Sequence, residues 1–392
     1  MTNKDYSEKD KKNYLQTFKR YPITMDYGKG SRVWDVEGKE YIDALAGIAV
    51  NVVGHDHPVL VKQIQEQVTK LIHISNFYLS KPQVELSEKL IGLSGLDRVF
   101  FANSGAESIE GAIKIARKYA HSIGRGGDII SFEGAFHGRT MATLAATGKK
   151  QMQEGFEPIP AGFKQVPFND DKAVHKAINK ETAAIIIEPI QGEGGINVVD
   201  SSFLKDLRHL CNEHDIVLII DEVQSGIGRT GKMFAYEHFG VTPDVMTLAK
   251  GLGGGVPIGA ILSNEKVSSA INYGDHGTTF GGNPLACSAA LAVLEIIKNE
   301  NLLQKAADNE KWLKKKIIEL NLPGFKEVRG KGLMIGVEFD FETKDLVARM
   351  LEKGVIANAT AGNVLRFVPP LNSSDEEVEK VIDVMVESIE ER

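Results

Sequence analysis

The sequence predicts an α/β fold built around a mostly parallel sheet. From Val99 onward, short apolar runs alternate with stretches of helical spacing, as in strand–helix–strand units. The runs are apolar at successive positions, which is typical of strands covered on both faces. The 28 residues between Asp221 and Lys250 are enough for a crossover, which needs about a dozen or more. We expect strands at residues 99–101, 128–131, 183–187, 216–220, 245–248 and 259–262.

The remaining elements are expected at both ends of the chain. Residues 1–22 form a partly helical lead-in, and residues 31–36 and 40–43 form a hairpin around Gly38. Two helices precede the sheet, at 58–72 and 82–93, and two follow it, one from Pro284 and one at 302–320. Strands at 332–339 and 364–368 precede a last helix. That helix is capped by Ser374 and turns Val378, Ile382, Met385 and Ile389 inward.

Bulk composition sets limits on the class of protein. The 392 residues exceed the usual size of one core, so two subdomains are expected, and the lack of a linker suggests that they interleave. A net charge of −7 gives no basic surface for nucleic acid or an anionic membrane. No apolar stretch approaches the ~18 residues of a membrane span, and no targeting segment is evident, so we expect a cytoplasmic protein. Cys211 and Cys287 are expected to be small core residues.

Three charged residues follow three of the predicted strands, namely Glu188, Asp221 and Lys250. In an open α/β sheet, ligands bind beyond the carboxyl ends of the strands, so these side chains are expected to share a site. A lysine and an aspartate can hold opposite sides of a flat, charged cofactor. The chemistry that uses such a pair is that of pyridoxal phosphate (PLP). Lys250 would form the Schiff base, and Asp221 would keep the ring nitrogen protonated.

Two glycine-containing segments could complete such a site. Ser104 and Glu107 have the spacing of a capping box, and the free amides at that helix start, beside Gly105, could bind a phosphate. The alternative is a capped helix without a ligand. Phe136 could stack on a flat cofactor and Arg139 could bind a carboxylate. Their alternative is a core phenylalanine and a surface arginine.

Two further motifs predict no site. The segment from Gly226 to Lys232 imitates a dinucleotide or P-loop pattern, but Met233 stands where a P-loop needs Ser or Thr. The nearby carboxylates of Asp221 and Glu222 would also repel a pyrophosphate. His55 and His57 suggest a metal only weakly, because no third ligand lies at a recognisable spacing.

Taken together, ten ordered segments between Tyr21 and Leu371 resemble the class III aminotransferases of the fold-type I PLP superfamily. They include Asn103–Glu107, Phe136–Arg139, Asp221–Gln224, Thr247–Lys250 and Thr279–Pro284. The resemblance implies a large PLP-binding domain, residues 56–284, with a mostly parallel seven-stranded sheet. It implies a smaller α+β domain made of residues 1–55 and 285–392. It also implies a homodimer with active sites at the interface.

The resemblance also implies a role for each matching residue. Lys250 would be the Schiff-base lysine and would move the substrate proton. Asp221 would pair with the ring nitrogen and Gln224 with the phenolic oxygen, while Phe136 and Val223 would enclose the ring. The phosphate would be held by Ser104, Gly105 and Ala106 and, from a neighbouring subunit, by Thr279.

Within the class, residues 162–170 and 360–366 are similar to the acetylornithine aminotransferases. Arg366 would then bind the α-carboxylate of glutamate and 2-oxoglutarate, and Arg139 that of acetylornithine. Glu193 would pair with Arg366 for the δ-amine substrate and swing away for glutamate. The implied reaction moves the δ-amino group of N2-acetylornithine to 2-oxoglutarate in arginine biosynthesis, giving N-acetylglutamate 5-semialdehyde and glutamate.

Other substrates and other classes stay open. Ile48 replaces a tyrosine of the ornithine enzymes, which disfavours ornithine but leaves 4-aminobutyrate possible. Succinylornithine or succinyldiaminopimelate could use the same residues, and a carrier-bound aminoadipate derivative would need a docking surface. A PLP racemase or decarboxylase would not need the Glu193–Arg366 switch. A PLP-binding regulator would need a separate DNA-binding module.

Overall fold

A seven-stranded sheet forms the centre of the molecule. The computed structural model describes all 392 residues. The strand order is β4-β12-β11-β10-β7-β5-β6, and only β12 runs antiparallel to its neighbours. The strands are β4 (Arg98–Ala102), β5 (Asp128–Phe132), β6 (Phe163–Val166), β7 (Thr182–Ile187), β10 (Val217–Asp221), β11 (Val245–Leu248) and β12 (Gly259–Ser263). The predicted α/β class and the mostly parallel sheet are confirmed.

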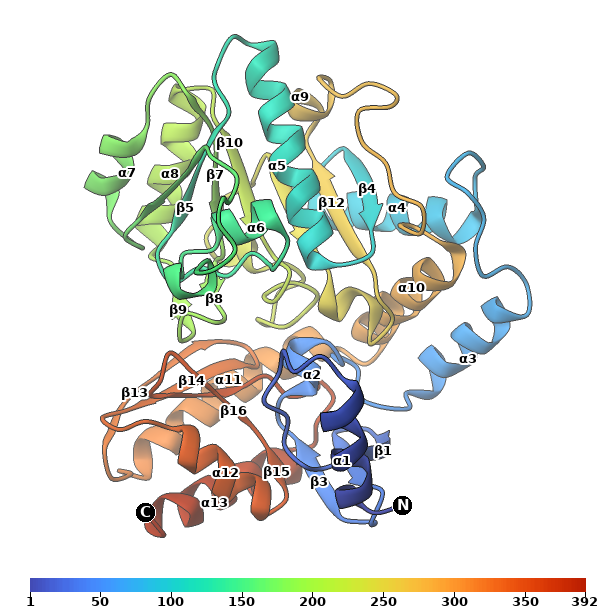
Figure 1. Cartoon of the computed structure of the whole chain (residues 1–392), viewed down its shortest axis with the longest axis vertical. Coiled ribbons are helices and arrows are strands. Elements are labelled where there is room, and N and C mark those ends of the chain that lie inside the picture. The colour runs from blue at the N-terminus through green and yellow to red at the C-terminus, as the bar shows by residue number, and fades with distance from the viewer.

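Both faces of this sheet are covered, which explains why its strands are apolar at successive positions. Along β10, Val217 and Ile219 join the cluster under α5 (Gly105–Ser122), whereas Leu218 and Ile220 join the main core on the opposite face. Helix α8 (Ser201–Glu213) packs against β10, and α5 packs against β7, β11 and β12. Figure 1 shows this layered upper part, with α5 in front of the sheet and α7 (Asp171–Ala177) and α8 at its side.

The lower part in Figure 1 is built from both ends of the chain, shown in blue and red. One sheet has the order β1-β2-β3-β15 and a second has the order β13-β14-β17-β16. Their strands are β1 (Met25–Lys29), β2 (Arg32–Asp35), β3 (Glu40–Asp43), β13 (Phe325–Lys331), β14 (Met334–Phe339), β15 (Val355–Ile356), β16 (Asn358–Thr360) and β17 (Val364–Phe367). The helices are α11 (Leu302–Glu319), α12 (Lys344–Glu352) and α13 (Asp375–Glu390).

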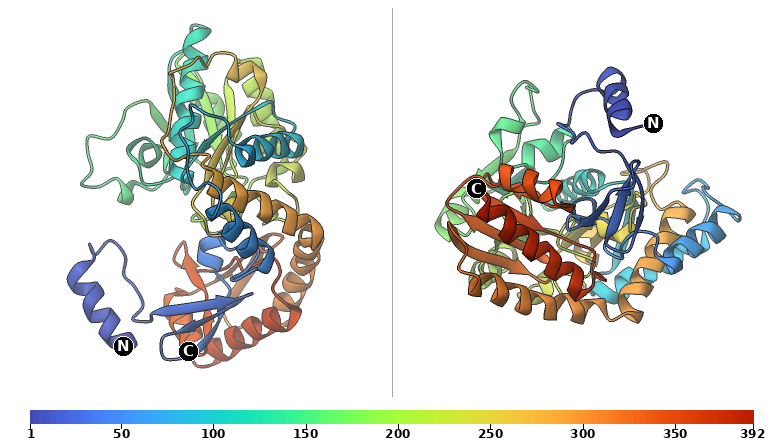
Figure 2. Two further views of the ribbon diagram at one scale, coloured as in Figure 1. Left: turned by 90° about the vertical axis from the view of Figure 1, so that its right-hand side faces the viewer. Right: turned by 90° about the horizontal axis from the view of Figure 1, so that it is seen from below.

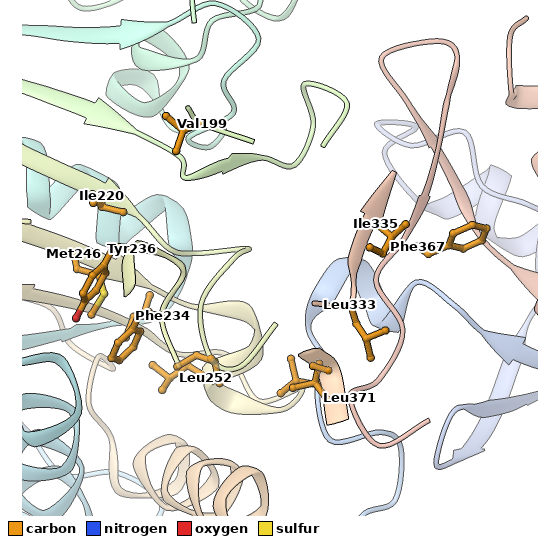
Figure 3. Packing of buried hydrophobic residues seen from close by; sticks show 14 of the residues in the cluster. Val199, Ile220, Phe234, Tyr236, Met246, Leu252, Leu333, Ile335, Phe367 and Leu371 are labelled. Carbon is orange, nitrogen blue, oxygen red and sulfur yellow. The ribbon is translucent and has the colours of Figure 1, made fainter. Parts of the chain in front are cut away.

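The two parts share apolar contacts. Helix α10 (Pro284–Asn299) packs against α3 (Pro58–Val68) and α4 (Lys81–Ser94) and also contacts α11. One buried cluster runs from Ile220 and Met246 in the large sheet to Ile335 and Phe367 in the lower part, as Figure 3 shows. The N-terminal helix α1 (Asn3–Asn13) has no buried residue and stands off from the body of the chain in Figure 2.

Most predicted elements are confirmed, with ends that differ by a few residues. The hairpin of β2 and β3, the helices from Pro58, Pro284 and Leu302, and the last helix are all present. Ser374 caps α13 in a full capping box with Glu377, and its four predicted inward residues are buried. Among the elements that were not predicted are strands β1, β6, β13, β15 and β16 and helix α12. Both cysteines are buried and free, as predicted.

None of the helices combines the length and the apolar character that crossing a bilayer requires.

His55 and His57 bond to different carboxylates, Asp43 at 2.9 Å and Glu300 at 2.8 Å. In the segment that imitates a P-loop, Arg229 is fully buried and donates to the carbonyls of Leu333 and Pro369. This segment therefore joins the large sheet region to the lower part.

Candidate active site

The carboxyl ends of three neighbouring strands open into one cavity of about 430 Å³. Glu188 follows β7, Asp221 ends β10, and Lys250 lies two residues beyond β11, and all three line the cavity. These strands are adjacent and parallel, so the three charged side chains meet although the chain separates them by tens of residues.

The backbone of Lys250 is strained. Its φ is +42°, a left-handed conformation that costs energy for any residue except glycine. The lysine opens the 3-10 turn η3 (Lys250–Gly253) directly after the strand. Burial lowers the pKa of its amine, although the negative charge of Glu193 acts to raise it. A lowered pKa makes the neutral amine more available, which is what a covalent and acid–base lysine requires.

Asp221 lies opposite as a buried acceptor. Its Oδ2 is 2.7 Å from Nδ1 of His137, and its Oδ1 accepts from the amide of Val223 at 3.0 Å. Burial opposes charge on His137, yet the hydrogen bond and charge of Asp221 outweigh it and raise the pKa of the imidazole. Asp221 is thus held in place by the imidazole and by the Val223 amide, and its carboxylate can also accept from a proton-bearing ligand nitrogen.

Glu188 connects two loops of the cavity wall. Its carboxylate accepts from the amide of Phe136 at 2.9 Å and from that of Gly192 at 3.2 Å. Burial raises the pKa of Glu188 to about 7, although His137 and the two amides favour the charged form. Glu188 thus holds the loop that carries Phe136 against the loop that carries Glu193.

The start of α5 supplies an anion site at one end of the cavity. Ser104 caps the helix by accepting from the amide of Glu107 at 3.2 Å. The predicted capping box is only half formed, because the Glu107 carboxylate accepts from the amide and side chain of Asn103, both at 2.8 Å. The amides of Gly105 and Ala106 precede the helical ladder and remain available to an anion. A Cβ at Gly105 would lie 2.7 Å from Val223, so glycine is required there.

A buried ion pair adjoins the cavity. Nη1 of Arg366 lies 2.5 Å from Oε1 of Glu193, and the arginine side chain is 0% exposed while that of Glu193 is 28% exposed. Asn358 accepts from Nε of Arg366 at 2.9 Å, and Gln224 of the cavity wall accepts from Nη1 at 3.3 Å. Burial opposes the charge of Glu193, but Arg366 overrides it and lowers the pKa of the carboxyl. Nη2 of Arg366 is buried without a partner.

The structure brings most of the sequence-predicted residues into one cavity, while the Glu193–Arg366 pair adjoins it through Gln224 and Thr279 lies outside it. The cavity is lined by Ser104, Gly105, Ala106, Phe136, Arg139, Asp221, Val223, Gln224 and Lys250. The exposed Arg139 lies 5.6 Å from the ring centre of Phe136. Thr279 is exposed and lies outside this cavity in its own chain.

Sequence reasoning did not assign roles to His137, Lys149, Asn358 and Thr360. His137 belongs to a motif that was noted, but nothing in the sequence showed that it would reach Asp221, 84 positions away. Lys149 donates to the main-chain oxygen of Glu193 at 2.6 Å, and burial lowers the pKa of its amine. Asn358 could have been found from strand pairing, because it lies opposite Arg366 in the β16–β17 ladder.

Comparison with known proteins identifies the family. The family described as aminotransferase class-III matches residues 15–389. The chain belongs to this family. It is 54% identical to the acetylornithine aminotransferase of Methanocaldococcus jannaschii, over 99% of this chain and 98% of that protein. It is 48% identical to that of Methanothermobacter thermautotrophicus, over 98% of each chain.

Solved structures show the same fold. The ornithine aminotransferase of Toxoplasma gondii matches 100% of this chain and 97% of its own, with a TM-score of 0.96 and 34% identity. A second structure of that enzyme, with a TM-score of 0.95, has PLP at partial occupancy in its active site; it covers 100% of this chain and 94% of its own at 33% identity. The acetylornithine aminotransferase of Elizabethkingia anophelis covers 100% of both chains, with a TM-score of 0.89 and 34% identity. The chain is therefore a class III aminotransferase by sequence and by fold.

Proposed function

We propose that this aminotransferase moves the δ-amino group of N2-acetylornithine to 2-oxoglutarate, giving N-acetylglutamate 5-semialdehyde and glutamate in arginine biosynthesis. The observation that carries the proposal is the buried Glu193–Arg366 pair beside the strained Lys250. A site that must bind a carboxylate in one half-reaction and reject it in the other needs an arginine that can be covered and uncovered. The acetylornithine enzymes that resemble this chain support the choice of substrate.

The cavity fits pyridoxal phosphate as the resident cofactor. Free amides at the start of α5, a carboxylate acceptor bonded to a histidine, and a buried lysine line one cavity. We propose that Gly105 and Ala106 hold the phosphate with Ser104, and that Asp221 and Gln224 bind the ring nitrogen and phenolic oxygen. Phe136 and Val223 would hold the two faces of the ring. Bound PLP supplies an electron sink for the carbon next to the substrate amine.

The side chains of this protein supply proton transfer and binding. Lys250, with its lowered amine pKa, would take the proton from the substrate carbon that bears the amine, and in the second half-reaction it would give a proton to the keto-acid carbon that receives the amine. Asp221, held by His137 at 2.7 Å, would accept a hydrogen bond from the protonated ring nitrogen. The cavity walls, closed by the Glu188 hydrogen bonds, keep both groups in place.

The two arginines divide the carboxylates between the half-reactions. We propose that Arg366 binds the α-carboxylate of glutamate and 2-oxoglutarate after Glu193 moves aside. Arg139, at the exposed side of the cavity, would bind the α-carboxylate of acetylornithine while Glu193 covers Arg366. Ile48 offers no hydroxyl to a charged α-amine, which favours an acylated one.

A panel of half-reactions tests the substrate. The purified protein is loaded with PLP, and the change of cofactor absorbance is followed in one turnover with acetylornithine, succinylornithine, ornithine or 4-aminobutyrate. The proposal expects acetylornithine to react with the largest kcat/KM and ornithine and 4-aminobutyrate to react poorly. A larger kcat/KM for either unacylated amine contradicts it. Succinylornithine, which uses the same residues, measures how strictly the acyl group is selected.

We also propose a homodimer in which Thr279 completes the phosphate site of the neighbouring subunit. Thr279 is exposed and outside its own cavity. Its neighbour Phe280 is exposed, and so is Phe77, which follows the Asn76 that donates to the carbonyl of Thr278. Mixing a Lys250→Ala protein with a Thr279→Asp protein tests this arrangement. In a mixed dimer one site carries both changes and the other carries neither, so the mixture regains activity. Sites contained within single chains would give no recovery.

Two further predictions complete the proposal. The large domain would comprise residues 56–284 and the small domain residues 1–55 with 285–392, consistent with the pairing of both chain ends in Figure 1. We also propose a cytoplasmic location, where an enzyme of arginine biosynthesis would act.

A further inference from the structure

The loop that carries Glu193 is held by side chains rather than by regular secondary structure. It joins β8 (Ile190–Gln191) to β9 (Asn197–Val198) and contains Gly192, Gly194 and Gly195. Such a glycine-rich segment is flexible by itself, because glycine has many accessible backbone conformations. Two of these glycines are required by the backbone: a Cβ at Gly194 would lie 2.9 Å from the main-chain oxygen of Gly134, and Gly195 has a φ of +109°.

Every main-chain carbonyl from Gly192 to Gly195 accepts a hydrogen bond from a side chain. The donors are, in order, Arg366 at 3.2 Å, Lys149 at 2.6 Å together with Thr360 at 2.8 Å, Asn197 at 2.9 Å, and Arg329 at 2.6 Å. Only the carbonyl of Glu193 accepts from two different residues. They arrive from different parts of the fold, because Lys149 follows α6 (Met141–Ala146) and Thr360 ends β16.

Strand β16 also determines the position of the partner arginine. Asn358 and Thr360 are two residues apart, so their side chains lie on the same face of the strand. Asn358 accepts from Nε of Arg366, and Thr360 donates to the carbonyl of Glu193. One strand face thus fixes both members of the ion pair, and only the carboxylate of Glu193 remains free to move.

We propose that Lys149 and Thr360 are positioning residues that fix the main chain of Glu193, so that the switch between the two half-reactions is a movement of its side chain alone. This inference rests on the proposed exchange of carboxylates at Arg366. If one of these hydrogen bonds to the Glu193 carbonyl is removed, the loop moves more and Glu193 is paired with Arg366 for less of the time. The paired state, needed for the δ-amine substrate, then becomes less populated, and the unpaired state, needed for glutamate, becomes more populated.

The test is the change in the ratio of the two half-reactions. Thr360→Val keeps the volume of a side chain that is 5% exposed but removes the hydroxyl. One hydrogen bond is worth about 0.5–1.5 kcal/mol net, so the glutamate to acetylornithine ratio of kcat/KM rises about two- to tenfold. Thr360→Ser, which keeps the donor, restores it. Lys149→Met shifts the ratio in the same direction and Lys149→Arg restores it, whereas Lys150→Met, at the exposed neighbouring position, leaves the ratio unchanged.

A binding measurement separates this inference from the proposed substrate. Glutarate, an unreactive dicarboxylate, needs Arg366 uncovered, so calorimetry should show Thr360→Val binding it about two- to tenfold more tightly than the unmodified protein does. A damaged site would bind it more weakly. Equal losses in both half-reactions, or glutarate binding that is unchanged or weaker, overturn the inference. If the unmodified protein reacts with glutamate but not with acetylornithine, the proposed substrate fails, and the glutarate result still decides the role of Thr360.

Discussion

Replacing Glu193 with glutamine keeps the shape of the side chain and removes the charge that covers Arg366. The two atoms of the pair lie 2.5 Å apart, and the arginine is 0% exposed, so water does not replace the lost carboxylate. A charge-assisted hydrogen bond is worth about 1.5–3 kcal/mol, which corresponds to roughly a ten- to 150-fold change in an equilibrium. We expect the glutamate to acetylornithine ratio of kcat/KM to rise by that factor, because glutamate no longer has to displace a competing carboxylate.

The assay is single-turnover mixing of the PLP-loaded protein with glutamate or acetylornithine, followed through the cofactor absorbance. Glu154→Gln is the matched control, since Glu154 is exposed and makes no ion pair, and it should leave both half-reactions unchanged. If Glu193→Gln slows both half-reactions equally, or changes neither, Glu193 does not select between the carboxylates and the assignment of Arg366 is wrong.

Three other changes test separate parts of the account. Asp221→Asn should slow both half-reactions by at least about a hundredfold, a usual size for electrostatic stabilisation, without lowering the melting temperature; near-normal turnover would contradict its role. Arg139→Ala should weaken acetylornithine far more than glutamate, whereas equal losses would show that the arginines are wrongly assigned. Glu222 accepts from Ser225 and Tyr236 away from the cavity, and burial raises its pKa from 4.5 to about 7. The free energy of unfolding that Glu222 contributes therefore falls as pH rises from 4.5 to about 7. Over that range the Glu222→Gln protein should become more stable relative to the unmodified protein, by up to about 3 kcal/mol. A difference in melting temperature that does not change with pH would refute this.

The sequence predicts the buried strands well because both faces of each one are covered. Residues 183–187 of β7 and 217–220 of β10 are all apolar, and the structure buries every residue of both strands. Strand β6 carries Lys164 and Gln165 and lies at the edge of the sheet, so it lacks this signal. Strand β13 is largely charged and only partly buried, and it was missed for the same reason.

Some residues of the candidate site could be predicted from the sequence and others could not. The residues at strand ends could be predicted, because parallel strands bring their carboxyl ends to one edge whatever the intervening sequence. Contacts between distant loops could not. Three contacts depend on side-chain directions that only the packed fold determines. They are the hydrogen bonds of His137 to Asp221, of Lys149 to the carbonyl of Glu193, and of Asn103 to Glu107.

The covalent attachment of PLP to Lys250 is the most direct test of the central claim. The protein is incubated with PLP, reduced with borohydride, digested and mapped by mass spectrometry, with Lys250→Ala treated in parallel. The account predicts a pyridoxyl label on Lys250 and no specific label on the variant. A protein that stays colourless and unlabelled, or a label that persists on another lysine in both samples, would contradict it.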